Sequence, residues 1–134
     1  MLSEALPAES CFKWALFGRE PLSQWTVGRT TLLGDAAHPM LPFLGMGATT
    51  ALQDGLVLAR CFRLTSSVDE ALACYRNAQL ARANFIMEGS LKRGKQTQRD
   101  HPETFNADDE RNEQSFGLFD YDAGEIELQK AANG

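Results

Sequence analysis

The residues best suited to chemistry lie in one loop, between Gly34 and Gly47. Asp35 directly follows a short apolar run, a position at which the ligand-contacting residues of α/β sheets gather. The same residue type also forms Asx-turns and caps nearby helices, and the residues alone favour neither role. His38 follows three residues later and is interpreted as a structural hydrogen-bonding residue. Asp35 and His38 lack the further His or carboxylate ligands that a metal site needs, so no metal is predicted.

Two glycines, Gly45 and Gly47, close this loop just before a helical pattern begins. Glycines let a ligand approach the backbone closely, and a helix N-terminus offers free N–H groups and the positive end of the helix dipole. This arrangement is typical of sites that hold anionic or polar cofactors. The segment is not a Walker loop, because no Lys follows it, and it is not a nucleophile elbow, because no Ser stands between the glycines.

Two strands are expected ahead of this loop. Weak alternation of aromatic residues predicts a strand over Cys11–Phe17, and the apolar run Thr30–Leu33 predicts a second, buried one. Between them, Gly18–Gly28 is predicted to be a loop or turn with a short helical piece. Trp25 within that loop is interpreted as a core anchor, because a Trp buries a large area.

Two long helices are expected after the loop, packed against each other. The first is predicted from about residue 46 to 63, with Gly55 marking close packing, and the second from residue 68 to 92 or a little past, after a capping box formed by Ser67 and Glu70. A polar tail follows, with a short helix over 107–119. The apolar faces comprise Ala48, Ala51, Leu52, Leu56, Ala59 and Phe62 in the first helix, and Leu72, Tyr75, Ala78, Ala83 and Ile86 in the second.

Composition limits the class of protein. At 134 residues the chain is long enough for one domain with a buried core. Its 18 acidic and 13 basic residues give a net charge of −5, which argues against a nucleic-acid-binding protein. No apolar run is long enough to cross a membrane, and Met1–Ser10 lacks the apolar region of a signal peptide. Cys11, Cys61 and Cys74 have no metal-type spacing, which favours reduced thiols in the cytoplasm.

The stretch from Trp25 to Asp54 resembles the second FAD-binding motif of the class A flavin-dependent aromatic monooxygenases, in their salicylate hydroxylase and 6-hydroxynicotinate 3-monooxygenase branch. The similarity extends over about residues 11–123. Met46 stands where this family commonly has Gln, Gln53 where it commonly has Glu, and Gln79 where an Arg is usual. The matching residues are Trp25, Gly28-Arg29, Thr31–Leu33, Gly34-Asp35-Ala36-Ala37-His38-Pro39-Met40, Pro42, Gly45-Met46-Gly47-Ala48 and Asp54.

This resemblance implies the fold class and the cofactor. The fold is expected to be an α/β fragment dominated by helices, the C-terminal part of a FAD/NAD(P)-binding-like fold. Residues 1–134 would form a partial FAD-binding domain, in which 11–62 supply the strands, the loop and the flavin-facing helix, and 68–123 the C-terminal helical part. The cofactor would be FAD, with NAD(P)H as the co-substrate of the complete enzyme.

The resemblance also implies a set of site residues. Asp35 would accept a hydrogen bond from a hydroxyl of the ribose–ribityl region of FAD, and Pro42 would line the reaction side of the flavin ring. The N–H groups of Gly47, Ala48 and Thr49 would face the flavin N1–C2=O edge, and Phe43 would border an aromatic substrate. No catalytic residue is assigned. The full set of expected FAD-binding residues is Gly34, Asp35, Pro42, Gly45, Gly47, Ala48 and Thr49.

The family's Gly-x-Gly-x-x-Gly unit and its substrate-binding sheet are not found in this sequence. We therefore expect a segment of an NAD(P)H- and FAD-dependent monooxygenase that hydroxylates an aromatic ring, incomplete and inactive alone. The alternative is a non-catalytic remnant or interaction module that assembles with a separate chain. The expected partners are an upstream chain carrying the glycine motif, or a second copy that covers the apolar surface of Thr30–Leu33 and the first helix.

Overall fold

The computed structural model describes residue 12, residues 14–97 and residues 117–129. Helices dominate this part of the chain, as expected, and one short antiparallel strand pair accompanies them. Neither long helix combines the length and apolar character that would let it span a lipid bilayer. In chain order the elements are β1 (Thr26–Val27), β2 (Thr30–Thr31), two short 3-10 helices, η1 (Gly34–Ala36) and η2 (Pro42–Leu44), then α1 (Gly47–Leu64) and α2 (Val68–Thr97).

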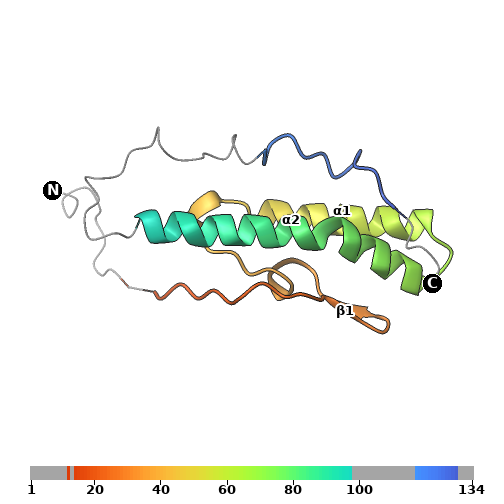
Figure 1. Ribbon diagram of the computed structural model, residues 1–134, viewed down its shortest axis with the longest axis horizontal. Coiled ribbons are helices and arrows are strands. Elements are labelled where there is room, and N and C mark those ends of the chain that lie inside the picture. Colours follow the sequence, from red (N-terminus) through yellow and green to blue (C-terminus); the bar gives the residue numbers. More distant parts are fainter. Residues whose placement is uncertain (1–11, 13, 98–116, 130–134) are drawn as a thin grey trace.

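Helices α1 and α2 lie side by side and run in opposite directions (Figure 1). The turn between them carries the predicted capping box. The Glu70 N–H donates to Ser67 Oγ at 3.2 Å, and the Ser66 N–H donates to Glu70 Oε2 at 3.2 Å, so the glutamate reaches one residue further back than expected. Both helices were predicted, and α2 ends at Thr97, a little past Lys92.

The core between the helices is built from the predicted face of α2 and a small, partly polar face of α1. Leu72, Tyr75, Ala83 and Ile86 of α2 are buried, which confirms the predicted stripe, and Ala78 is half-buried. The buried residues of α1 are Thr50, Asp54, Val57 and Cys61. The Cys61 and Cys74 thiols are both free and lie 2.9 Å apart across the interface; Cys11 is outside the described residues.

The apolar stripe of α1 points away from α2. Leu52 is 77% exposed, and Leu56 and Phe62 are also exposed, because the small and polar residues of α1 occupy the inner face. Gly55 lies on the outer side with open space around it, so the prediction that it marks close packing is wrong for the described residues. A contiguous apolar strip of this kind is typical of a surface that another protein segment covers.

The strand pair is a small hairpin that the sequence analysis did not predict. Thr26 pairs with Thr31 and Val27 with Thr30 around Gly28, which has a φ of +55°. The expected buried strand Thr30–Leu33 is therefore shortened to Thr30–Thr31, and it is exposed to half-buried. No helical piece forms between residues 18 and 28. Trp25 is buried, with its ring centroid 5.9 Å from that of Tyr75, which confirms it as a core anchor.

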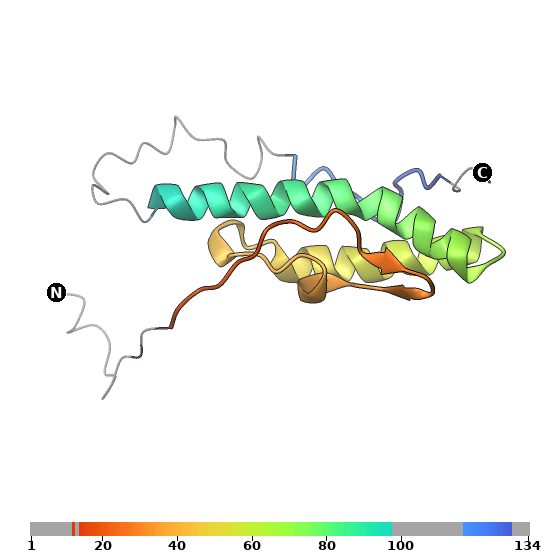
Figure 2. The ribbon, with the colours of Figure 1, turned by 60° about the horizontal axis from the view of Figure 1, so that its bottom comes forward.

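The strand predicted over Cys11–Phe17 is wrong for the residues that can be described there. Phe12 and residues 14–17 form no strand, and the side chains of Phe12, Trp14 and Phe17 are exposed. An alternating strand needs a neighbour to satisfy its backbone, and no described strand lies against it. Residues 14–25 instead run as an extended segment past the helix pair (Figure 2).

The segment 117–129 lies across the helix pair, on the side opposite the hairpin (Figure 1). The Tyr121 hydroxyl donates to Gln79 Oε1 at 3.0 Å, and the Arg82 guanidinium lies 3.6 Å from the centre of the Tyr121 ring. Arg60 of α1 donates to the Ala123 carbonyl at 2.6 Å. Of the helix predicted over 107–119, residues 117–119 form a turn and a bend, and the remainder lies outside the described residues.

Candidate functional site

The loop between β2 and α1 begins with a turn that only glycine can make. Gly34 is buried and has a φ of +58°, in the left-handed region that other residues rarely adopt. A Cβ at this position would lie 3.2 Å from the Cβ of Ala51, which is closer than usual packing allows. Gly34 therefore brings the turn directly against α1.

A buried carboxylate in α1 holds this turn. The Gly34 N–H donates to Oδ2 of Asp54 at 3.0 Å, and Nε2 of His38 lies 2.6 Å from the same oxygen. An ionised carboxylate can only accept hydrogen bonds, so Nε2 of His38 carries the proton that it shares. Both side chains are fully buried, and Asp54 Oδ1 and His38 Nδ1 have no hydrogen-bond partner among the described residues. The pair thus links the start and the middle of the loop to the helix.

Aromatic side chains enclose this pair. The Trp25 and His38 ring centroids are 5.4 Å apart, and the Tyr75 hydroxyl donates to the Leu32 carbonyl at 3.4 Å. Burial, followed by the negative charge of Asp54, raises the pKa of Tyr75, which keeps its phenol protonated. The interpretation of His38 as a structural hydrogen-bonding residue is confirmed. The sequence analysis included Asp54 in the family pattern but did not assign it to the site. In the structure it lies on the same buried face of α1 as Thr50 and Val57.

Arg19 holds the loop from the other side. Its guanidinium donates to the Ala36 carbonyl at 2.8 Å and to the Ala37 carbonyl at 2.7 Å. The extended segment that carries Arg19 is itself attached to α2, because Asn84 Nδ2 donates to the Leu22 carbonyl at 3.1 Å. Arg19 is a second residue that the sequence reasoning did not assign to the site.

Asp35 lies within η1 and is exposed. Its carboxylate makes no hydrogen bond to any other residue that the structure describes, and no side chain caps η1. Asp35 therefore does not cap η1, which was one of the two roles that the sequence left open. The carboxylate is instead available as an acceptor for a ligand.

The second half of the loop ends at an uncapped helix N-terminus. Gly45 closes η2 with a φ of +64°, and Met46 is the N-cap of α1 without any side-chain hydrogen bond. The first turn of α1 contains no acidic residue, and its Gly47, Ala48 and Thr49 N–H groups precede the first possible intrahelical bonds. A Cβ added at Gly47 would meet no described heavy atom within 4 Å, leaving aside its chain neighbours and its own helix backbone. An electron-rich group could therefore approach these donors directly.

Other loop residues are used for packing. The Phe43 ring is half-buried and packs against Gly94 of α2, and the Ser90 hydroxyl donates to the Leu41 carbonyl. Pro42 is exposed at the start of η2. Within residues 12, 14–97 and 117–129, no three His, Cys, Asp or Glu side chains gather to form a possible metal site.

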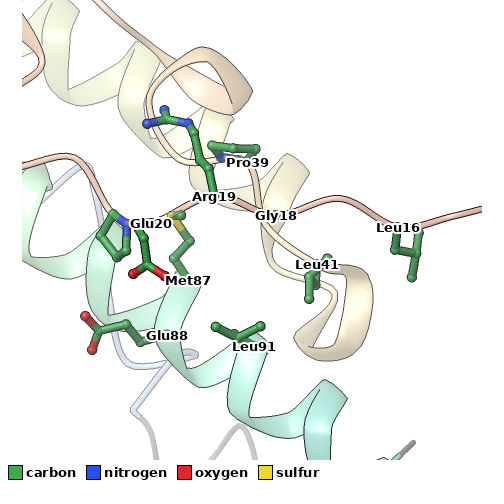
Figure 3. Close-up of a pocket in the computed structure, with 10 residues that line it drawn as sticks. Leu16, Gly18, Arg19, Glu20, Pro39, Leu41, Met87, Glu88 and Leu91 are labelled. Atoms are coloured by element: carbon green, nitrogen blue, oxygen red, sulfur yellow. The ribbon is translucent and has the colours of Figure 1, made fainter.

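A pocket of about 680 Å³ lies between the extended segment and α2 (Figure 3). In this view, Leu16 and Leu41 lie toward one end and the carboxylates of Glu20 and Glu88 toward the other. None of the predicted FAD-binding residues is among its described lining, although the pocket shares Pro39 and Leu41 with the loop between Gly34 and Gly47. The described lining residues are Leu16, Gly18, Arg19, Glu20, Pro21, Pro39, Leu41, Met87, Glu88 and Leu91.

Comparisons with known proteins assign this loop and helix to a family. Residues 13–90, more than half of the chain, match the family described as FAD binding domain. The chain is 37% identical over 133 residues to 6-hydroxynicotinate 3-monooxygenase of Bordetella bronchiseptica, covering 98% of this chain and 32% of that enzyme. It is 38% identical over 84 residues to 3-hydroxybenzoate 6-hydroxylase of Polaromonas naphthalenivorans, covering 62% and 21%.

A solved structure and a further relative agree with this assignment. The crystal structure of FqzB superimposes with a TM-score of 0.57 at 39% identity, over 58% of this chain and 19% of that protein. Aurachin C monooxygenase/isomerase of Stigmatella aurantiaca is 42% identical over 93 residues, which cover 69% of this chain and 24% of the relative. The chain thus spans about a fifth to a third of the length of these curated relatives.

The residues present fit FAD. The Asp35 carboxylate can accept from a hydroxyl of the sugar chain, and the α1 N-terminus can receive an electron-rich ring edge. The family match covers the loop, both 3-10 helices and α1. The chain therefore belongs to the FAD-binding domain family of the class A FAD-dependent aromatic monooxygenases.

Proposed function

We propose that this chain is the FAD-binding C-terminal segment of an NAD(P)H- and FAD-dependent monooxygenase that hydroxylates an aromatic ring, and that it is inactive alone. The observation that carries the proposal is that one loop of a chain of this family presents both an exposed carboxylate, Asp35, and the uncapped N-terminus of α1. The short span of the chain relative to its relatives supports the second part of the proposal.

In this proposal the loop holds the ribityl and flavin end of FAD. Asp35 accepts a hydrogen bond from a sugar hydroxyl, the exposed Gly45 allows close backbone approach, and Pro42 lines the ring, while Gly34 holds the turn against α1. The N–H groups of residues 47–49 at the start of α1 face the flavin N1–C2=O edge and stabilise negative charge there. FAD itself supplies electron transfer from NAD(P)H and oxygen activation. The chain's own residues bind and orient the cofactor and polarise it.

The substrate is proposed to be a small aromatic molecule. The names of two relatives state hydroxynicotinate and hydroxybenzoate as the compounds on which those enzymes act. Phe43 stays a prediction as a substrate contact, and its packing on Gly94 gives it a structural role in either case. No general base is assigned, because His38 and Tyr75 are fully buried in the conformation described. A cytoplasmic location is part of this proposal, since Cys61 and Cys74 are free thiols.

The exposed stripe of α1 favours a partner. Leu52, Leu56 and Phe62 are exposed on one helix face, and burying them would be favourable. We propose that this face packs on the part of the protein that carries the Gly-x-Gly-x-x-Gly unit, whether in the same polypeptide or a separate chain. The second candidate function, a non-catalytic interaction module, uses the same face but requires no FAD.

A chimera separates the two candidates. This chain replaces the matching segment of the Bordetella bronchiseptica 6-hydroxynicotinate 3-monooxygenase, to which it is 37% identical. The purified chimera should be yellow, with one FAD per chain, and should oxidise NAD(P)H with formation of a hydroxylated aromatic product. A matched chimera with Asp35→Ala should retain less FAD. A folded but colourless chimera would reject the FAD-binding function and favour the interaction module.

A further inference from the structure

We infer that Asp54 is a positioning residue, which acts with His38 to set the place of the Gly34–Asp35 turn relative to the N-terminus of α1. The inference rests on the proposed function in one respect, because it treats Asp35 as a residue that contacts FAD. The claim that Asp54 holds the turn against α1 does not depend on FAD. Asp54 itself is fully buried and reaches no ligand, so it acts through the turn that it holds.

The turn is held on both sides of Asp35 by one oxygen atom. Oδ2 of Asp54 accepts from the Gly34 N–H at 3.0 Å and pairs with His38 Nε2 at 2.6 Å. Between these two points, the Ala37 and His38 N–H groups donate to the Gly34 carbonyl at 2.8 and 2.9 Å, which closes the turn. Asp35 therefore lies in a short closed turn whose two ends are bonded to the same carboxylate.

The same carboxylate belongs to the helix that supplies the proposed flavin-facing donors. Asp54 is part of α1, and Gly47, Ala48 and Thr49 form its first turn. A helix is a rigid element, so fixing the turn to Asp54 also fixes Asp35 relative to those N–H groups. The proposed acceptor for the sugar hydroxyl and the proposed donors for the ring edge are thus joined through Asp54. Without this connection, the loop would be held by its backbone turns and by Arg19, which is not part of α1.

Burial makes this connection strong and specific. Asp54 and His38 are both fully buried, and Trp25 packs on the His38 ring, so water does not compete for the shared oxygen. Gly34 adds a steric requirement, because its turn approaches Ala51, one helical turn before Asp54. Charge, burial and shape therefore all specify a single position for the turn.

Amide hydrogen exchange on the full 134-residue chain without FAD tests the connection. The Gly34 amide should exchange as slowly as amides in the middle of α1. In Asp54→Leu, which is similar in size but has no acceptor, Gly34 should lose at least about ten-fold more protection than α1 does. Asp54→Asn keeps an acceptor oxygen and should retain most of the protection. The control is Val57→Ala, a substitution at a buried position on the same face of α1. It should lower the exchange protection of Gly34 and of the α1 amides by the same factor.

The opposite results are equally clear. If Gly34 exchanges as fast as an exposed loop amide in the unsubstituted chain, the inference is overturned, and this measurement needs no variant to fold. The inference is also overturned if Asp54→Leu lowers the exchange protection of the Gly34 amide by the same factor as that of the α1 amides.

A double-mutant cycle for FAD affinity in the chimera tests the action through Asp35. Asp54→Leu should weaken FAD binding by about ten-fold with Asp35 present, and by less than about two-fold in an Asp35→Ala background. If Asp54 acted only on overall stability, Asp54→Leu would weaken FAD binding by the same factor with Asp35 present and with Asp35→Ala. That result would overturn the inference. If Asp35→Ala alone leaves FAD affinity unchanged, the proposed function loses that contact, and the Gly34 exchange result still decides whether Asp54 positions the turn.

Discussion

Replacing Asp54 with Ala should destabilise the folded chain substantially. The substitution removes the acceptor of two hydrogen bonds and leaves the Gly34 N–H and the His38 Nε2–H buried without partners. An unsatisfied buried donor costs about 1–3 kcal/mol, so two of them give about 2–6 kcal/mol. Part of this loss is offset, because Asp54 Oδ1 has no hydrogen-bond partner in the described part of the chain and removing the carboxylate relieves its desolvation. The net loss expected is about 2–4 kcal/mol.

Urea unfolding followed by circular dichroism measures this effect, with the free energy of unfolding obtained by linear extrapolation. Asp54→Asn keeps an acceptor oxygen and should lose about 1 kcal/mol or less. The control is Glu88→Ala, an exposed carboxylate in α2, which should stay within about 0.5 kcal/mol of the unsubstituted chain. If Asp54→Ala behaved like Glu88→Ala, the assignment of Asp54 as the anchor of the loop would be refuted.

Three further predictions concern the cofactor, the exposed stripe and the thiols. Asp35→Ala should weaken FAD binding in the chimera by roughly ten- to a hundred-fold, because it removes a charge-assisted hydrogen bond; an unchanged dissociation constant would reject the contact. Leu52→Glu with Leu56→Glu should reduce self-association of the isolated chain in light scattering, and an unchanged mass distribution would show that this face is not used. Burial and the neighbouring Cys74 thiol raise the pKa of Cys61 from 9.0 to about 12, so the unfolded chain releases this proton first as pH rises. The free energy of unfolding should therefore be highest below about pH 9 and fall toward pH 12, and Cys61→Ala should reduce that fall in a urea series; identical slopes would contradict it.

The helices could be predicted because their signals are local. The capping box at Ser67 and Glu70 marks the start of α2, and periodic apolar residues mark its buried face. The end of α2 was predicted at residue 92 or a little past, and the helix ends at Thr97. Periodicity also identified the apolar stripe of α1, but it cannot tell which element, inside or outside the chain, that stripe packs against.

The strands were predicted poorly because their stability depends on partners. The hairpin around Gly28 contains only two residues in each strand, too few for a pattern. The large apolar residues Phe12, Trp14 and Leu16 alternate, yet the described part of the chain offers no strand to pair with them. Tertiary context decides such segments, and a single sequence does not contain it.

The site was only partly visible in the sequence. The loop glycines were recognisable, and Gly34 and Gly45 do adopt positive φ. Asp35 was identified as the residue after the strand, and the structure describes it as exposed and without a partner in the resolved turn. Asp54 was overlooked because a polar residue in an amphipathic helix is normally solvated. Its burial and its contact with Gly34, twenty residues earlier in the chain, show that it faces inward.

The most direct test of the central claim is the dissociation constant for FAD of the 134-residue chain alone and of the chimera, both measured by flavin fluorescence. In the proposed arrangement the loop reaches only the ribityl and flavin end, so a few hydrogen bonds of about 0.5–1.5 kcal/mol each must offset an association cost of at least about 4 kcal/mol. We therefore expect the chain alone to bind more weakly than micromolar, and the chimera to bind at least about a hundred-fold more tightly, a gain of about 2.7 kcal/mol. A monomeric chain that holds FAD at micromolar affinity by itself, or a folded chimera that holds none, would contradict the account.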